Sequence, residues 1–309
     1  MPPLRRTPKR RPAALIAGVL LLAVGGTLIA PGVGAEAATG GEQVARGKYL
    51  FAAASCGTCH TAKDGESGGG GRRFDGPFGT VYSTNITPHR QAGIGAWNDE
   101  QIATAIRQGR RPNGERLIPV HPYLSLQGMA DDDVRALVAY LRTLPAVKRA
   151  NQPRRIKVPF FERVFLPAWV AAFGPRGDPP ASAPASGLAR GEYLVRAVSH
   201  CGECHTPRHI TMTMDTARFL AGNPSGLIEN AKVPNITPHK GTGIGGWTED
   251  QIADFLSTGN TPDGDVAGDL MGELIEGKGG GYKDMTQADR LAIAQYLKTI
   301  PPIRNKVQR

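Results

Sequence analysis

Apolar residues recur at helical spacing in four segments, one near the start and one near the end of each half of the chain. The starting segments cover about 42–54 and 186–199, and the ending segments cover about 131–143 and 287–299. Spacings of three and four residues between apolar positions are typical of a helix with one buried face. Four amphipathic helices are therefore predicted. In the segment 131–143 the apolar positions are Val134, Leu137, Val138 and Leu141.

Two further helices are predicted from the signals at their ends. Each is expected to begin at a capping box, in which a polar side chain and a Gln three residues later bond each other's backbone amides. Each is expected to end at a glycine, Gly109 or Gly259, because glycine readily adopts the left-handed conformation that follows a helix. The capping-box pairs are Asn98 with Gln101 and Thr248 with Gln251.

The chain contains one internal repeat. ARGKYLFAAASCGTCH at 45–60 returns as ARGEYLVRAVSHCGECH at 189–205, and ALVAYLRTLPAV at 136–147 returns as AIAQYLKTIPPI at 292–303. Between these segments, NITPH occurs once in each copy and is followed by GIGAW or GIGGW. Two copies with so long a period are too few for a solenoid. The expected fold class is therefore all-α, with two tandem domains.

The predicted division of the chain has four parts. Residues 1–40 form a targeting segment, 41–150 the first domain and 186–309 the second domain. Residues 151–185 hold an aromatic stretch, VPFFERVFLPAWVAAFG, and a Pro/Ala/Ser linker without a core-forming pattern. The aromatic stretch is interpreted either as a strap that packs across the domains or as a docking surface for a partner subunit or the membrane.

Composition and charge limit the classes of partner. The 309 residues carry a formal net charge of +10, and only 6% of them are aromatic, while 40 are Gly and 25 are Pro. We therefore expect small helical domains with many ordered loops and another group filling the interior. Residues 1–37 hold a net charge of +4, so the remainder is modestly basic and suits an acidic protein or an anionic membrane surface. Nucleic acid is not expected as a partner, because no basic run is interleaved with aromatic residues.

The N-terminus has the pattern of an export signal. Residues 5–11 are basic, residues 13–30 are apolar and uncharged, and residues 35–37 (AEA) resemble a cleavage site. An apolar run of this length is long for a signal peptide and short for a membrane-spanning helix, so a cleaved signal and a retained anchor both stay open. Because basic residues remain cytoplasmic, both interpretations predict a periplasmic protein. The anchor interpretation adds attachment to the inner membrane through 13–30.

All four cysteines belong to two C-x-x-C-H motifs. This motif attaches c-type haem: its two thiols bind the haem vinyl groups and its histidine ligates the iron. Zinc would require four ligands in one cluster, whereas each motif belongs to its own repeat, and a redox dithiol does not need the histidine. Two covalently bound haem c groups are therefore expected, one in each domain. Their attachment residues are Cys56, Cys59 and His60 for haem 1 and Cys201, Cys204 and His205 for haem 2.

The repeated motifs resemble the class I cytochrome c domains in the cytochrome subunits of membrane-associated alcohol and sugar dehydrogenases. The resemblance rests on ARGxYL before each cysteine motif, NITP, GIGxW, a Pro-x-Gly turn and the last helix. It covers 41–150 and 186–309, although those subunits often carry three such domains. It implies a helical fold and a carrier that passes electrons from a dehydrogenase toward quinone or a terminal oxidase.

The resemblance also implies where the second axial ligand of each iron lies. In class I domains this ligand is usually a methionine from the loop before the last helix. In the second repeat that loop contains Met271, whereas its counterpart in the first repeat, LIPVHPY at 117–123, contains His121. The expected iron ligands are therefore His60 with His121 for haem 1, and His205 with Met271 for haem 2. Met129, at the start of the last helix, remains the alternative to His121.

The other histidines and methionines are weaker candidates for axial ligands. His89 and His239 follow NITP in both copies, so they cannot explain why only the first copy lacks the loop methionine. Met212 and Met214 lie too close behind the second cysteine motif for the geometry of the family. Met285 occupies the same place as Met129, and both are interpreted as packing residues.

An electron carrier is the leading interpretation of the function. No acid/base pair, nucleophile or phosphate-binding loop stands out in the sequence, so no catalytic residues are assigned and the cofactor carries the chemistry. The alternative is a haem enzyme, such as a dihaem peroxidase or a thiosulfate-oxidising cytochrome, which needs a labile ligand on one iron. Pro119 and Pro122 flank His121 and favour a fixed ligand.

Overall fold

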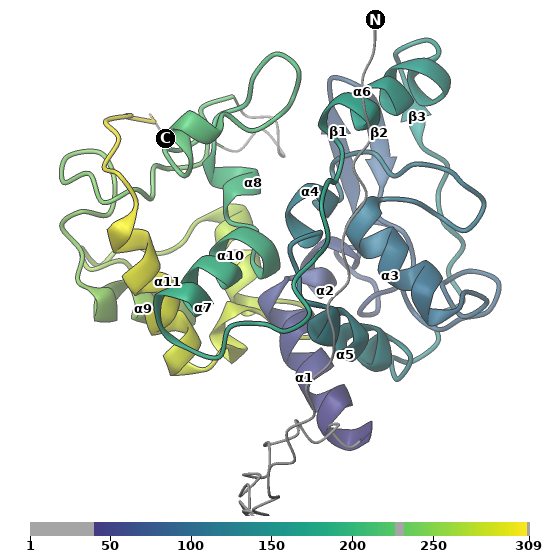
Figure 1. Cartoon of the computed structure of the whole chain (residues 1–309), viewed down its shortest axis with the longest axis horizontal. Helices are drawn as coiled ribbons and strands as arrows, with labels where there is room; N and C mark the ends of the chain where they lie inside the picture. Colours follow the sequence, from purple (N-terminus) through teal and green to yellow (C-terminus); the bar gives the residue numbers. More distant parts are fainter. Residues whose placement is uncertain (1–39, 226–231, 308–309) are drawn as a thin grey trace, which may run out of the picture. The chain divides into compact units, whose positions relative to one another are not determined.

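The computed structural model describes residues 40–225 and 232–307. These described residues belong to one compact unit (Figure 1). The basic residues 5–11 and the apolar run 13–30 lie outside the described residues. Within the described ranges, no helix is both long enough and apolar enough to cross a bilayer.

The first repeat begins and ends with helices that cross each other. Helix α1 packs against α5, and Gly47 lies at the crossing. A Cβ atom at Gly47 would come within 1.9 Å of the Ala136 carbonyl oxygen, so the close approach of the two backbones requires glycine. The elements of this repeat are α1 (Gly40–Ala53), α2 (Cys56–Cys59), β1 (Arg73–Gly76), β2 (Gly79–Tyr82), α3 (Asp99–Gln108), α4 (Tyr123–Leu126) and α5 (Asp131–Leu141).

The second repeat has the same crossing between α7 and α11. There a Cβ atom at Gly191 would lie 2.0 Å from the Ala292 carbonyl oxygen. The glycine of ARGxYL is thus explained in both copies by the packing of the first helix on the last. The elements are α7 (Gly187–Tyr193), η2 (Leu194–Val198), α8 (Gly202–His205), η3 (Thr216–Arg218), α9 (Glu249–Thr258), α10 (Asp269–Glu276), η4 (Tyr282–Asp284) and α11 (Gln287–Thr299).

The predicted helix ends are confirmed at both capping boxes. Asn98 and Gln101 exchange side chain to backbone bonds at the start of α3, and Thr248 and Gln251 do so at the start of α9. The glycines that end these helices, Gly109 and Gly259, have φ angles of 58° and 76°. The apolar face predicted for 131–143 is buried in α5.

The helix before the second cysteine motif contains one more residue than its counterpart. Arg46 lies ten positions before Cys56, whereas Arg190 lies eleven positions before Cys201. The structure accommodates the extra residue by converting the last turn of the helix into the π-helical segment η2. A π-turn holds one more residue than an α-helical turn, so it absorbs the extra residue. Both copies therefore keep the same helix crossing.

A small antiparallel sheet interrupts the helical fold. Strands β1 and β2 form a hairpin, and β3 (Arg155–Ile156) pairs with β2. Segments η1 (Phe161–Phe165) and α6 (Leu166–Phe173) follow, and Leu166 is buried with Val81 and Ile118. The helix-rich fold was predicted, but this sheet was not, because the glycine-rich loop that forms β1 and β2 shows no clear alternation of apolar residues.

The aromatic stretch between the repeats has both buried and exposed side chains. Trp169 Nε1 donates a hydrogen bond to the Thr211 carbonyl of the second repeat at 2.7 Å. Phe160, Val164 and Phe165 are more than half exposed, so the docking interpretation stays open.

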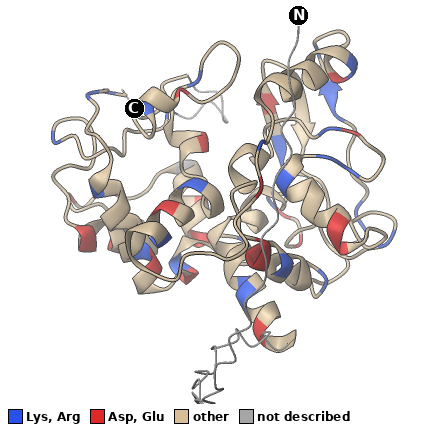
Figure 2. Ribbon diagram, viewed as in Figure 1, with Lys and Arg blue, Asp and Glu red and all other residues tan. Residues whose placement is uncertain are grey.

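The two repeats share one hydrophobic core. A single cluster of buried side chains includes Phe51 and Met129 from the first repeat and Val195 and Met285 from the second. The burial of both helix-entry methionines agrees with a packing role. Figure 2 shows that Lys and Arg are interspersed with Asp and Glu along the helices of both repeats. The four-part division of the chain stays a prediction.

Candidate haem-binding sites

The two motif histidines are oriented in the same way. His60 Nδ1 lies 2.7 Å from the Thr84 carbonyl oxygen, and His205 Nδ1 lies 2.8 Å from the Pro234 carbonyl oxygen. A hydrogen bond from Nδ1–H to a carbonyl fixes the tautomer and leaves Nε2 for a metal. Burial lowers the pKa of both histidines, which favours the neutral form that ligates iron. Both residues therefore fit the role of proximal haem ligand.

The NITP motif holds the carbonyl groups that orient these histidines. Asn85 directly follows Thr84, and its buried side chain donates to the Val147 carbonyl and accepts from the amide and hydroxyl of Thr87. Asn235 has the equivalent bonds to Ile303 and Thr237. The repetition of NITP is thus explained by support of the proximal histidine. Sequence reasoning did not find this role, although the recurrence of the motif was a signal.

The motif cysteines are suited to haem attachment better than to thiolate chemistry. All four are half-buried. Loss of water raises the pKa of Cys56, Cys201 and Cys204 to about 12, whereas reactive dithiols and zinc ligands need a lowered pKa. Across 40–225 and 232–307, no group of three or more His, Cys, Asp or Glu side chains could hold a metal ion by itself. The donor set therefore fits thioether-linked haem.

The ring of His121 lies close to the ring of His60. The ring centroids of the two histidines are 6.3 Å apart and the rings are inclined by 77°. Imidazoles on opposite sides of one iron have centroids roughly 6 Å apart, since a metal–imidazole bond is about 2 Å long and each nitrogen lies about 1 Å from its ring centroid. Burial, together with His60, lowers the pKa of His121 to about 3, so its imidazole is neutral. The distance between the rings therefore fits a shared iron.

The methionines of the second repeat lie in different surroundings. Met271 is half-buried on α10 and packs against the hydrophobic core. Met214 approaches the second cysteine motif: its sulfur would lie 3.4 Å from a Cβ atom at Gly202. Met271 as a ligand of haem 2 stays a prediction, and Met214 is the methionine against which it should be tested.

The histidines that follow NITP have a local role. Nδ1 of His89 accepts hydrogen bonds from the amides of Gln91 and Ala92, and Nδ1 of His239 accepts them from Gly241 and Thr242. These bonds close the turn before GIGxW in each repeat. This local role agrees with the interpretation of both histidines as weak candidates for iron ligands.

The two cysteine motifs meet where the repeats pack together. Nε2 of His200, the residue before Cys201, lies 3.3 Å from the carbonyl oxygen of Ala54, two residues before Cys56. Ser55 and His200 each precede the first cysteine of their motif and have left-handed φ angles of 52° and 39°. Tyr282, which is buried, donates to the Ser199 carbonyl at 3.3 Å. The attachment residues of both motifs are therefore close to the same interface.

Two tyrosines of ARGxYL reach across this interface in a reciprocal way. Tyr49 Oη donates to Asp289 at 2.5 Å, and Tyr193 Oη donates to Asp133 at 2.6 Å. Each aspartate also pairs with the arginine of its own repeat, Arg190 or Arg46 respectively. These contacts were not predicted, since the sequence does not reveal which residues face each other across the repeats.

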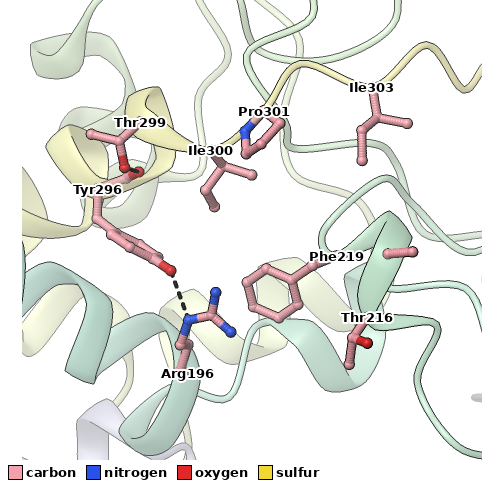
Figure 3. A pocket seen from close by; sticks show the side chains of 9 residues that line it. Arg196, Thr216, Phe219, Tyr296, Thr299, Ile300, Pro301 and Ile303 are labelled. Carbon is pink, nitrogen blue, oxygen red and sulfur yellow. Dashed lines mark hydrogen bonds between the residues drawn. The ribbon is translucent and has the colours of Figure 1, made fainter.

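A cavity of about 250 Å³ lies beside the second motif (Figure 3). Its walls include Arg196, Phe219 and Tyr296. The Arg196 guanidinium lies 4.3 Å from the Phe219 ring centroid, and its Nε donates to the Tyr296 hydroxyl at 2.7 Å. Phe219 also packs on the motif, because a Cβ atom at Gly202 would lie 2.6 Å from its ring. Cation–π contact and hydrogen bonding thus hold this side of the motif.

Comparisons with known proteins agree with the site. A family model described as cytochrome c matches residues 44–145. The chain is similar to a dihaem cytochrome c-type protein of Cereibacter sphaeroides, with 39% identity over 84% of this chain and 87% of that protein. It is also 36% identical to the fructose dehydrogenase cytochrome subunit of Gluconobacter japonicus, over 94% of this chain and 59% of that subunit.

A third relative is the cytochrome c subunit of alcohol dehydrogenase (quinone) from Gluconacetobacter polyoxogenes. It is 38% identical over 84% of this chain and 56% of the subunit. The chain thus spans less than two thirds of both dehydrogenase subunits. With the C-x-x-C-H geometry described above, these similarities show that the chain carries covalent haem c and belongs to the family of c-type cytochromes formed by dihaem cytochromes c and dehydrogenase cytochrome subunits.

Proposed function

We propose that this protein carries electrons from a dehydrogenase to quinone or a terminal oxidase through two covalently bound haem c groups. Bound haem supplies reversible one-electron transfer. The relatives named as cytochrome subunits of fructose and alcohol dehydrogenases support a dehydrogenase as the donor. The chain acts in this proposal as a carrier without catalytic residues, in the periplasm, with 13–30 as signal or anchor.

The proposed iron ligands are His60 with His121 for haem 1 and His205 with Met271 for haem 2. The observation that carries the assignment for haem 1 is the separation of 6.3 Å between the His60 and His121 rings, whereas the assignment of Met271 to haem 2 rests on the internal repeat and the family resemblance. His121 is held by its surroundings: its Nε2 lies 3.3 Å from the Ile106 carbonyl oxygen, and the Tyr123 ring lies 6.3 Å away. A ligand held in this way is suited to a carrier, because electron transfer is fast when the coordination of iron does not change.

The two proposed ligand sets give the haems different reduction potentials. Methionine as the second axial ligand raises the potential relative to histidine. Haem 1 is therefore the lower-potential centre and haem 2 the higher one. In this order, a single electron on the protein resides mainly on haem 2, which is therefore the first centre to be reduced at equilibrium.

Ligand variants of the full-length holoprotein test this assignment. His121→Ala should make haem 1 high-spin in the ferric state and leave the methionine–iron charge-transfer band at the red edge of the visible spectrum intact. Met271→Ala should abolish that band, whereas Met214→Leu, the matched control, should not. If Met129→Leu makes haem 1 high-spin while His121→Ala does not, Met129 is the ligand and the order of potentials disappears.

A peroxide assay separates the carrier from a haem enzyme. The holoprotein, reduced and then mixed with hydrogen peroxide, should oxidise slowly and without turnover, because both irons have two protein ligands. Full reduction by a substrate-reduced quinoprotein or flavoprotein dehydrogenase, monitored in the α band, is the positive result. Rapid turnover of peroxide with an added electron donor would contradict the carrier.

A further inference from the structure

The loop that carries His121 continues into α4, which packs against the helix before the second cysteine motif. Ser125 on α4 donates a hydrogen bond from Oγ to Oε1 of Glu203 at 2.6 Å. Glu203 is the third residue of the motif C-G-E-C-H and is 7% exposed. Gly128 follows, and a Cβ atom there would lie 3.2 Å from Cβ of Ala197 in η2. The loop before the last helix of the first repeat is thus held by the attachment motif of the second.

The Glu203 carboxylate cannot easily move away from Ser125. Arg208 Nη2 donates to Oε2 of Glu203 at 2.5 Å and to the Glu203 carbonyl oxygen at 2.9 Å. The side chains of this ion pair are only 10% and 11% exposed. One carboxylate oxygen therefore binds Arg208 and the other binds Ser125, so the carboxylate acts as a fixed link between the motif and α4.

A reciprocal contact links the first cysteine motif to the second repeat. Thr58 occupies in the first motif the place of Glu203, and its hydroxyl donates to the Glu273 carbonyl at 3.4 Å. Glu273 lies on α10, two residues after Met271. Arg72 Nη1 donates to the Thr58 carbonyl at 3.2 Å and to Oε2 of Glu273 at 2.5 Å. Helix α10, which carries Met271 where the sequence predicted a loop, is thus held on the attachment motif of the first repeat.

We propose that each C-x-x-C-H motif positions the segment that carries the axial ligand of the other haem. Glu203 acts as a positioning residue for His121 through Ser125, and Thr58 with Arg72 acts as a positioning pair for Met271. The proposal rests on the axial ligands assigned under the proposed function. It predicts that a substitution within the motif of haem 2 changes the coordination of haem 1.

Cyanide binding to the ferric, full-length holoprotein measures how firmly His121 is held. Cyanide must displace an axial ligand, and the methionine band reports whether haem 2 is the site of displacement. Ser125→Ala removes one hydroxyl and leaves the Glu203–Arg208 pair in place. Because a hydrogen bond to a charged group is lost, the affinity of haem 1 for cyanide should rise about tenfold, with the methionine band unchanged. Ser125→Thr, which keeps the hydroxyl, should restore the original affinity.

Glu203→Thr gives the second motif the residue that the first motif has at this position. It should raise the cyanide affinity of haem 1 as Ser125→Ala does, and the double variant should show little further effect, because both changes remove the same link. Additive effects, or a response of haem 2 alone, would overturn the proposal. If Glu203→Thr does not fold because Arg208 lacks its partner, the comparison of Ser125→Ala with Ser125→Thr still tests whether the Ser125 hydroxyl holds the His121 loop.

Two controls separate this proposal from the ligand assignment. His121→Ala should itself open haem 1 to cyanide. If it does not, the axial assignment under the proposed function is wrong. If it does, while Ser125→Ala leaves the affinity unchanged, the assignment stands and the positioning role of Glu203 is refuted. The reciprocal variant Thr58→Val should weaken the methionine band without opening haem 1; an unchanged band would refute that half.

Discussion

Tyr193 and Tyr49, the tyrosines of the two ARGxYL segments, hold together the junction between the repeats, which is the interface that their hydroxyl groups cross. Replacing Tyr193 by Phe should lower the free energy of unfolding more than replacing Tyr49 by Phe. The Tyr193 hydroxyl donates to the fully buried Asp133 carboxylate at 2.6 Å and accepts from the Ala130 amide at 3.0 Å. Both partners belong to the first repeat. The substitution keeps the aromatic ring and removes only these two bonds.

The expected loss of stability follows from what each partner keeps. Asp133 retains its ion pair with Arg46, so the change removes one hydrogen bond to a charged group, about 1.5–3 kcal/mol. The buried Ala130 amide loses its hydrogen-bond acceptor, which costs about 1–3 kcal/mol. Because the losses share one site and partly relax together, we expect about 2–4 kcal/mol in the free energy of unfolding.

Tyr49→Phe is the matched control on the other side of the junction. Tyr49 donates to Asp289 at 2.5 Å, but its second bond, from the Thr286 amide, is long at 3.4 Å and exposed. The expected loss is therefore smaller, about 1–2 kcal/mol. Guanidinium unfolding of the ferric holoproteins, followed by far-ultraviolet circular dichroism, gives both values. A Tyr193→Phe loss equal to or smaller than the Tyr49→Phe loss would show that the Ala130 amide is not the costly partner.

Three further predictions concern the haems and the junction. Cys56→Ala with Cys59→Ala should halve the haem-to-protein ratio measured by the pyridine haemochrome method; an unchanged ratio would contradict attachment at the first motif. Cleavage of a protease site inserted within 175–186 should leave the two halves together on gel filtration, because they share a hydrophobic core; separate elution would refute this. Burial opposes ionisation of Asp289, but bonds from Arg190 and Tyr49 outweigh it and hold its pKa below the ordinary value of 3.8. The stability that ionised Asp289 contributes should therefore be complete above about pH 4 and fall as the pH drops through its pKa in the folded protein. Tyr49→Phe should move the midpoint of acid unfolding to higher pH. An unchanged midpoint would contradict the role of Tyr49.

Local signals were sufficient to predict the ends of α3 and α9, whereas the attachment residues read from the C-x-x-C-H motifs stay a prediction. Capping boxes and C-cap glycines act through the backbone within one turn, so Asn98, Gly109 and their counterparts could be read directly. The prediction that His121 is an iron ligand came from the internal repeat together with the family resemblance, because the loop LIPVHPY could be compared with its methionine-bearing copy.

Contacts between distant segments could not be predicted in the same way. Tyr49 and Asp289 are 240 positions apart. The sequence around a tyrosine does not show whether its side chain contacts the other repeat or packs within its own. The extra residue between Arg190 and Cys201 was visible in the sequence, yet its conversion into a π-turn follows from the need to keep the Gly191 crossing. The strands β1 and β2 depend on β3 and Leu166, which lie far along the chain.

The contacts between the repeats form a symmetric and an asymmetric set. The tyrosine–aspartate pairs are symmetric, since Tyr49 and Tyr193 occupy equivalent places and reach equivalent aspartates. The contacts of the ligand loops are not: Ser125 binds a buried carboxylate, whereas Thr58 binds a backbone carbonyl. A symmetric junction holds the repeats together whichever axial ligand each loop carries. Under the proposed ligand assignment, changes confined to the segments before the last helices therefore suffice to give one repeat His121 and the other Met271, and with them two different potentials, without altering the core that both repeats share.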